Sequence, residues 1–203
     1  GIDYLVSEGV LEDTPEDIAR FLHKNAARLD ATKTGELLGH RDNTALLRAF
    51  TSRLNFEGLE FDVALRRYLQ TFLMPGEAQV IERYMEAFAA RFHEANPEVF
   101  PDQDTAFIMA FALIMLNTDA HNPAIPPERK MKKNQFIYNN RKLWGPNGED
   151  PPQELLETLY DSIIEQAIRF RDSEPAEKMG NLKRPSGSFN SVTQYWFVLS
   201  DQC

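Results

Sequence analysis

Apolar residues recur at the period of an α-helix through most of this chain. The clearest run lies between residues 61 and 72, where apolar positions three or four residues apart share one face of a helix. Such faces are formed by Phe61, Ala64, Leu65, Tyr68, Leu69 and Phe72; by Ile81, Tyr84, Met85, Phe88 and Phe92; and by Leu155, Leu156, Leu159, Tyr160, Ile163 and Ile164. The pattern predicts an all-α fold up to about residue 168, in which successive helix hairpins stack.

Two further helices are indicated by their start signals. Asp13-Thr14-Pro15-Glu16-Asp17 combines a capping residue, a proline and two acids, which is typical of a first helical turn. Asp104-Thr105 is expected to cap a second helix, whose residues 106–116 are apolar on every side. A helix without a polar face belongs in the centre of a domain, because no side of it is well solvated by water.

Composition narrows the classes of function. The chain has 203 residues, 42% of them hydrophobic, which is enough for one helical domain and a little more. Its net charge of −9 is opposite to the basic footprint of a nucleic-acid binder, so no nucleic-acid partner is expected. The single cysteine, Cys203, provides no disulfide framework. The longest apolar run, 106–116, is far shorter than the roughly 20 residues of a membrane span.

The pattern changes after Phe170. Residues 171–187 are charged and contain Pro and Gly, whereas residues 195–199 are aromatic and β-branched, as strands are. We therefore expect a helical domain over residues 1–170, a linker over 171–177 and, over 178–203, the truncated start of a β-rich domain. At the other end, the first residues already follow a helical spacing, so the sequence is expected to be a piece of a longer chain.

A proline-glycine turn separates two of the amphipathic helices. Met74-Pro75-Gly76-Glu77-Ala78-Gln79 interrupts the periodicity, and Glu77 is predicted in the first turn of the following helix. One interpretation is structural: the carboxylate complements the helix dipole or closes the helix cap, which is worth about 0.3–1 kcal/mol. The other interpretation is functional: a rigid turn presents the carboxylate of Glu77 to a partner.

A polar string follows the apolar helix. Asn117-Thr118-Asp119-Ala120-His121-Asn122-Pro123 is rich in residues that suit turns. Asp119 and His121 could form a metal-binding or acid–base pair, but without a third ligand a turn or surface role is favoured. Met109 and Met115 are most simply core residues, although methionine also suits a partner-binding surface. No GxxxxGK[ST] loop is present, so the chain itself is expected to bind neither GTP nor ATP.

Two of these segments together resemble the signatures of Sec7 domains. Residues 72–79, FLMPGEAQ, are similar to the first signature, FRLPGEAQ. Residues 104–123, which end in MLNTDAHNP, are similar to the second, which ends in MLNTDxHNP. The resemblance extends from Ile2 to about Phe170. Residues 180–183 and 195–199 resemble the first strands of a pleckstrin-homology domain, in an order similar to that of cytohesin-like exchange factors.

The resemblance implies a superhelix of helical hairpins followed by a compact bundle, with a hydrophobic groove between them. It implies a guanine-nucleotide exchange factor, which binds a GDP-loaded Arf-family GTPase at its switch regions and holds it nucleotide-free after GDP release. Glu77 matches the family's "glutamic finger", whose carboxylate displaces the GDP β-phosphate and Mg²⁺ without covalent chemistry. No cofactor is implied.

Other positions match the surroundings of the finger and groove. Those implied to bind the GTPase are Gly76, Ala78, Gln79, Glu82, Phe111, Ile114, Met115, Asn117, Thr118, Asp119 and Asn122. Asn117, Thr118 and Asp119 are implied to shape the loop, and Arg83 is expected to touch the GTPase beside Glu82. The chain departs from the family at Ala120, where leucine is common.

Two further consequences follow from the resemblance. Sec7 domains that brefeldin A traps carry Tyr-Ser where this chain has Phe111-Ala112, and an Asp and a Met that Asp119 and Met131 match. Because Phe111 and Ala112 supply no hydroxyl partner, weak or absent inhibition is expected. The pleckstrin-homology-like start implies a cytoplasmic protein that is recruited to phosphoinositide-containing membranes of the Golgi, endosome or plasma membrane.

Two other classes of function remain open. A non-catalytic, armadillo-like helical scaffold explains the periodicity, but it does not explain why the Pro-Gly-Glu turn and the NTDAHNP string occur together. A hydrolase that uses Glu77, Asp119 and His121 lacks a nucleophile and a third metal ligand.

Overall fold

The computed structural model describes residues 2–73, 77–171, 178–182 and 195–199, so Met74, Pro75 and Gly76 of the turn lie outside the described residues. The helices are α1 (Ile2–Ser7), α2 (Pro15–Lys24), α3 (Ala31–Gly39), η1 (Arg41–Asn43), α4 (Thr44–Ser52), α5 (Phe61–Leu69), α6 (Ala78–Ala95), α7 (Gln103–His121), η2 (Pro127–Arg129), α8 (Lys133–Asn139) and α9 (Gln153–Glu165). The strands are β1 (Lys178–Leu182) and β2 (Tyr195–Leu199).

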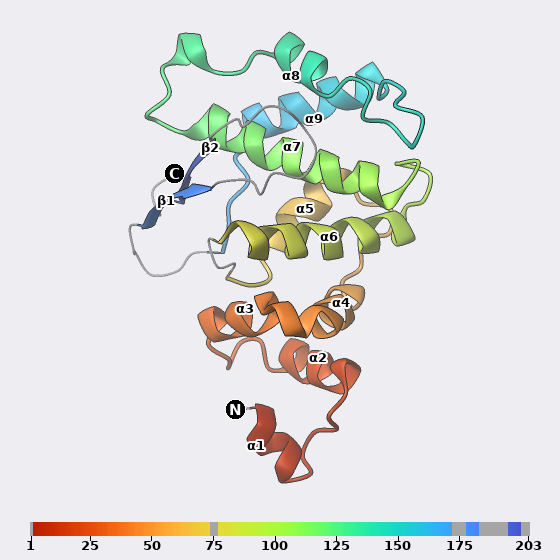
Figure 1. Ribbon diagram of the computed structural model, residues 1–203, viewed down its shortest axis with the longest axis vertical. Coiled ribbons are helices and arrows are strands. Elements are labelled where there is room, and N and C mark those ends of the chain that lie inside the picture. The colour runs from red at the N-terminus through yellow and green to blue at the C-terminus, as the bar shows by residue number, and fades with distance from the viewer. Residues whose placement is uncertain (1, 74–76, 172–177, 183–194, 200–203) are drawn as a thin grey trace.

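The helices are stacked along the long axis of the molecule (Figure 1). The α1 helix lies at the end that holds the N-terminus, α2, α3 and α4 follow, α5 and α6 occupy the middle, and α7, α8 and α9 form the opposite end. The α6 and α7 helices pack along each other, and α7 also packs against α9. This arrangement confirms the predicted all-α architecture of stacked helices.

The helix starts follow the rules of capping, with one correction. Thr14 caps α2 as predicted, because its hydroxyl accepts a hydrogen bond from the Asp17 N–H at 3.3 Å and Pro15 follows it. The prediction that Asp104-Thr105 caps α7 is wrong. Asp102 is the cap, since its backbone is extended and its carboxylate accepts a hydrogen bond from the Thr105 N–H at 2.7 Å.

The core is built around aromatic rings from α5, α6 and the segments on either side of α5. The Tyr68 ring lies 4.9 Å from that of Phe72, 5.3 Å from that of Phe88 and 6.2 Å from that of Phe56, measured between centroids. Its hydroxyl donates a hydrogen bond to the Tyr84 carbonyl at 3.1 Å, so this fully buried polar group is satisfied. Burial raises the pKa of Tyr68, and the hydroxyl therefore stays neutral.

The α7 helix is buried on several sides, as its apolar sequence predicts: Met109 and Leu116 are at most 1% exposed. The prediction that the whole polar string 117–123 forms a turn is wrong, because α7 continues to His121 and the chain turns only at Asn122. The reason is that the side chains of Asn117 and Asp119 bond to distant segments instead of to their own backbone.

The two strands pair in antiparallel register, with Gly180 opposite Phe197 and Leu182 opposite Tyr195. The strand pattern of residues 195–199 is thus found as β2. The predicted linker is described only at Arg171, because residues 172–177 lie outside the described ranges, as do 183–194 and 200–203. Among the helices that are described, none combines the length and the apolar character needed to cross a bilayer.

Candidate partner-binding groove

Glu77 is the N-cap residue of α6, one position before its predicted place in the first turn. Its backbone carbonyl accepts hydrogen bonds from the N–H groups of Val80 and Ile81, both at 3.0 Å. The side chain makes no capping hydrogen bond and is exposed to solvent. Cap closure therefore does not explain this carboxylate. Its place at the positive end of the α6 dipole remains favourable for a negative charge.

Phe72, five residues before Glu77, is a buried aromatic residue that fixes this part of the chain to the core. The ring of Phe72 stacks on that of Tyr84 at a centroid distance of 4.4 Å, and the side chain is 1% exposed. Phe72 belongs to the predicted apolar face of α5, although the helix itself ends at Leu69. The segment that leads to the predicted turn is thus held by the core at Phe72.

The start of α6 is held against the end of α3. The Nε and Nη2 atoms of Arg83 donate hydrogen bonds to the carbonyl of Gly39, the last residue of α3, at 3.1 and 2.5 Å. The Tyr84 hydroxyl donates to the Gly35 carbonyl at 2.9 Å. A Cβ atom at Gly39 would lie 2.6 Å from the Val80 side chain, so only glycine allows this approach.

Arg83, which the resemblance placed beside Glu82 at the GTPase surface, is half-buried, and its guanidinium is hydrogen-bonded within the fold. Glu82 and Gln79, by contrast, are exposed on the same helix, and Ala78 is half-buried. The surface beside Glu77 is therefore formed by Gln79 and Glu82.

One face of α7 presents partly exposed apolar side chains. Phe107 and Phe111 are half-buried neighbours whose ring centroids lie 5.0 Å apart, and Met115 continues the same face one turn later. Ile108 beside them is 37% exposed. A helix that otherwise belongs to the core thus carries an apolar stripe that a partner could cover.

Two of the residues predicted to bind the partner are buried in this structure, Ile114 and Asn117. Ile114 is 4% exposed, so its side chain supports the stripe from behind. The amide of Asn117 is bonded in both directions to the backbone of Ile168: it accepts from the N–H at 2.7 Å and donates to the carbonyl at 3.2 Å. The hydroxyl of Thr118 donates a hydrogen bond to the Ile114 carbonyl at 3.0 Å, within α7. These residues shape the helix end.

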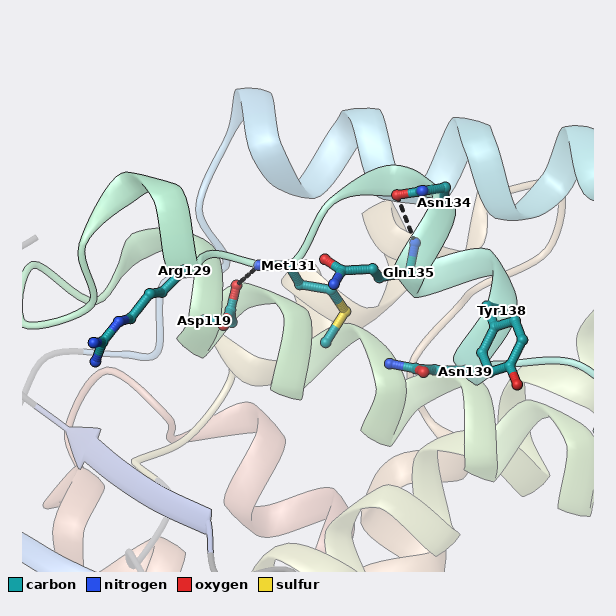
Figure 2. A pocket seen from close by; sticks show the side chains of 7 residues that line it. All are labelled: Asp119, Arg129, Met131, Asn134, Gln135, Tyr138 and Asn139. Atoms are coloured by element: carbon teal, nitrogen blue, oxygen red, sulfur yellow. Dashed lines mark hydrogen bonds between the residues drawn. The ribbon is translucent and has the colours of Figure 1, made fainter.

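The end of α7 borders a hollow of about 520 Å³ (Figure 2). The Asp119 carboxylate accepts a hydrogen bond from the Met131 N–H at 2.5 Å, and this bond joins α7 to the segment before α8. Lys130 donates to the Ala120 carbonyl at 2.6 Å, which places a positive charge at the negative end of the α7 dipole. The residues that line the hollow are Asp119, Arg129, Met131, Asn134, Gln135, Tyr138 and Asn139.

The side chains of Asp119 and His121 are hydrogen-bonded to different segments. Asp119 bonds to the Met131 backbone, whereas a ring nitrogen of His121 lies 2.6 Å from the Ile163 carbonyl, on α9. Within the described ranges no three His, Cys, Asp or Glu side chains gather as metal ligands would. Asn122 ends α7, and its side-chain carbonyl accepts a hydrogen bond from the Ala124 N–H at 2.9 Å. The string is therefore a connector between helices.

Sequence reasoning missed the α8 side of the hollow. Tyr138 is 62% exposed, and Asn134, Gln135 and Asn139 are exposed on the same short helix. Seven residues of mixed polarity give too short a pattern to show which face a helix presents. The aromatic Tyr138 among the amide side chains of Asn134, Gln135 and Asn139 was the one sequence signal for this side of the hollow.

The chain matches known sequences over its whole length. A sequence model of the Sec7 domain matches residues 1–168. The chain is 44% identical to the Dictyostelium discoideum "Ankyrin repeat, PH and SEC7 domain containing protein secG" and 39% identical to human cytohesin-2, with all of the chain covered in both cases. It is 42% identical over 86% of its length to "Brefeldin A-inhibited guanine nucleotide-exchange protein 2" of Arabidopsis thaliana. It spans 21%, 52% and 10% of these relatives, respectively.

Solved structures share the fold. The N-terminal Sec7 domain of RalF is similar with a TM-score of 0.75 and 37% identity, which covers 84% of this chain and 83% of that one. A Sec7 domain bound to ARF1-GDP and complexed with brefeldin A is similar with a TM-score of 0.73 and 37% identity, which covers 83% of this chain and 85% of that one. Sequence and fold point to the same family.

Proposed function

Because the chain belongs to the Sec7-domain family, we propose that it is a guanine-nucleotide exchange factor that releases GDP from Arf-family small GTPases. The observation that carries the proposal is the exposed, uncapped carboxylate of Glu77 at the N-terminus of α6. The α7 helix, which packs on α6, supplies an apolar stripe. The solved complex of a Sec7 domain with ARF1-GDP supports the choice of partner class.

GDP release depends on the negative charge of Glu77 being placed beside the β-phosphate of the nucleotide. When the switch regions dock on the stripe of α7, the Glu77 carboxylate enters the nucleotide site of the GTPase. Two unit charges 4 Å apart at an effective dielectric constant of about 20 repel each other by about 4 kcal/mol. The carboxylate therefore repels the β-phosphate of GDP and competes for the lysine that binds it. A bias of about 4 kcal/mol corresponds to roughly a thousandfold in rate.

Binding energy from the groove holds the carboxylate in this unfavourable position. Phe111 and Met115 offer partly exposed apolar surface, and Gln79 and Glu82 offer polar contacts beside Glu77. Asp119 and Asn122 set the shape of the helix end. Exchange is then differential stabilisation of the nucleotide-free complex, without a covalent step. No cofactor of the chain takes part.

The strands after residue 178 suggest where the reaction takes place. We assign them to the start of a pleckstrin-homology domain, for which the PH and SEC7 domains in the name of the secG relative are the support. Such a domain binds phosphoinositide headgroups and recruits a cytoplasmic protein to a membrane surface. The division into residues 1–170, 171–177 and 178–203 belongs to this proposal.

The test is release of a fluorescent GDP analogue from a panel of purified Arf-, Ras-, Rho- and Rab-type GTPases. We expect the wild-type protein to accelerate release from Arf-type GTPases alone. Glu77→Lys should lower the exchange rate by about a thousandfold. It should keep its melting temperature, because the side chain is exposed. The new lysine should also retain GDP in a stable complex, which gel filtration with labelled GDP detects.

The chain offers a matched control in Glu60, which is also an exposed N-cap glutamate without a capping hydrogen bond, on α5. Glu60→Lys makes the same charge reversal at the same helical position and should exchange at the wild-type rate. Normal exchange by a folded Glu77→Lys protein would falsify the assignment of the finger. Binding of a GTPase without release of its nucleotide would favour the scaffold alternative.

A further inference from the structure

The end of α5 is completed by a residue that lies far away in sequence. The last carbonyls of an α-helix have no partner within the helix. At the end of α5, the Arg67 carbonyl accepts a hydrogen bond from the Thr71 hydroxyl at 3.0 Å. The carbonyl of Leu69, the last residue of the helix, accepts a hydrogen bond from the backbone N–H of Arg171 at 3.3 Å.

The side chain of Arg171 bonds to the same place. Its Nη1 atom donates a hydrogen bond to the carbonyl of Thr71 at 3.1 Å, so backbone and guanidinium together hold two carbonyls of the chain that leaves α5. The positive charge also lies at the helix end where the dipole is negative. Arg171 can reach this point because Ile168, three residues earlier, is tied to α7 by the two hydrogen bonds of Asn117.

Thr71 is the base of the turn that carries Glu77. It precedes the buried anchor Phe72, and five residues separate it from Glu77, so the chain between them can span at most about 22 Å. The other side of the turn is held by Arg83, through its bonds to Gly39. Arg171 is thus the counterpart of Arg83: each ties one side of the turn to a distant part of the fold.

We propose that Arg171 is a positioning residue for Glu77: by closing the end of α5 it fixes the base of the turn that carries the carboxylate. It acts through the turn and not on the nucleotide. The inference rests on the proposed function, because it concerns the placement of the group that expels GDP. It predicts that loss of the guanidinium lowers the turnover of exchange and leaves docking of the GTPase on α7 unchanged.

The experiment compares kcat and KM for exchange on an Arf-type GTPase. Arg171→Ala should lower kcat about fivefold, which corresponds to about 1 kcal/mol, and leave KM unchanged. Arg171→Lys, which retains the charge and a donor, should recover most of the loss. Arg169→Ala is the matched control, since Arg169 is an exposed arginine of the same segment that makes neither of these bonds. It should behave as wild type.

Amide hydrogen exchange provides a readout that does not depend on activity. The peptide that spans residues 69–73 should exchange faster in Arg171→Ala than in wild type or Arg169→Ala, because the base of the turn has lost one of its two ties. Faster exchange together with a lower kcat supports the inference. A kcat equal to that of wild type, or a loss shared by Arg169→Ala, overturns it.

The two proposals fail in different ways. If wild type is active and Glu77→Lys is inactive, but Arg171→Ala has wild-type kcat and KM, the positioning role is wrong and the exchange function stands. A change in KM alone also contradicts the positioning role, since it would place Arg171 in docking. A wild-type protein that releases no GDP from any Arf-type GTPase contradicts the exchange function itself.

Discussion

At the scale of residues, the polar side chains near Glu77 and along α7 have two distinct roles. Arg83, Asn117 and Asp119 are bonded to backbone groups of other segments, and they set the shape of the site. Glu77 and Glu82 are exposed, and they are the groups that a partner can meet. A change at the first kind should act through the fold, whereas a change at the second should act on exchange.

Sensitivity to brefeldin A is a prediction at this scale. Phe111 and Ala112 are half-buried on α7, and neither carries a hydroxyl that could bond to a ligand. Asp119 and Met131 match the other two positions of the sensitive pattern, and the structure joins them by a hydrogen bond at 2.5 Å. We expect the wild-type protein to exchange nucleotide almost unhindered by the drug. Phe111→Tyr combined with Ala112→Ser should make it sensitive.

The measurement is the exchange rate on an Arf-type GTPase over a range of drug concentrations. Phe107→Tyr adds a hydroxyl to the neighbouring half-buried ring one turn earlier, and this control should leave the response unchanged. Full inhibition of the wild-type protein at low concentrations of drug would contradict the prediction. So would a double variant that stays as resistant as wild type.

At the scale of elements, α7 combines a core helix with a contact surface. Its apolar sequence has no polar side, yet Phe111 and Met115 remain half-buried while Met109 is 1% exposed. The difference arises because α6 and α9 cover parts of the helix and leave a stripe open. Two methionines of one helix can therefore be used to separate stability from binding.

Met109→Ala should mainly lower stability, whereas Met115→Ala should mainly weaken binding of the GTPase. Met109→Ala opens a cavity in the core and should lower the free energy of unfolding by about 2–5 kcal/mol. Met115→Ala should change stability much less, because part of its side chain is already in water, and should weaken docking of the GTPase. Thermal melting followed by circular dichroism, beside the KM for exchange, distinguishes them. A large loss of melting temperature in Met115→Ala with an unchanged KM would assign Met115 to the core.

At the scale of the whole molecule, charge is unevenly distributed. The chain carries a net charge of −9, but residues 129–148 contain six Lys or Arg and no Asp or Glu. Part of this basic charge is paired on the surface of the chain: Lys133 pairs with Asp161 at 2.6 Å, and the Arg141 guanidinium lies over the Tyr138 ring. The net acidic chain should be repelled by an anionic membrane.

Vesicle sedimentation tests this charge argument. We expect the 203-residue chain to stay in the supernatant with phosphoinositide-containing vesicles. A chain extended past residue 203, so that it holds the whole of the proposed pleckstrin-homology domain, should pellet with them and exchange nucleotide faster on their surface. Its binding should weaken as salt is raised, because the attraction is electrostatic. Equal pelleting of both chains, insensitive to salt, would place the membrane contact in the helical part.

Much of the helical architecture could be predicted from local patterns. The capped start at Thr14, the apolar faces of α5 and α6 and the central place of α7 all follow from spacing and residue type. The turn that Pro75-Gly76 predicts before Glu77 lies outside the described residues and stays a prediction. The cap of α7 was misplaced because Asp102 and Asp104 are equally good capping residues, and only the backbone conformation selects Asp102.

The sequence by itself therefore determined that residues up to about 168 are mainly helical, which faces of α5 and α6 are buried and where a glutamate follows a Pro-Gly pair. Only the tertiary structure decided that Arg83 binds Gly39, that Asn117 binds Ile168 and that Arg171 closes α5. The physical reason is one of range. Helical periodicity and capping arise from residues three or four positions apart, whereas these bonds join segments about 40 to 100 residues apart and form only once the helices have packed.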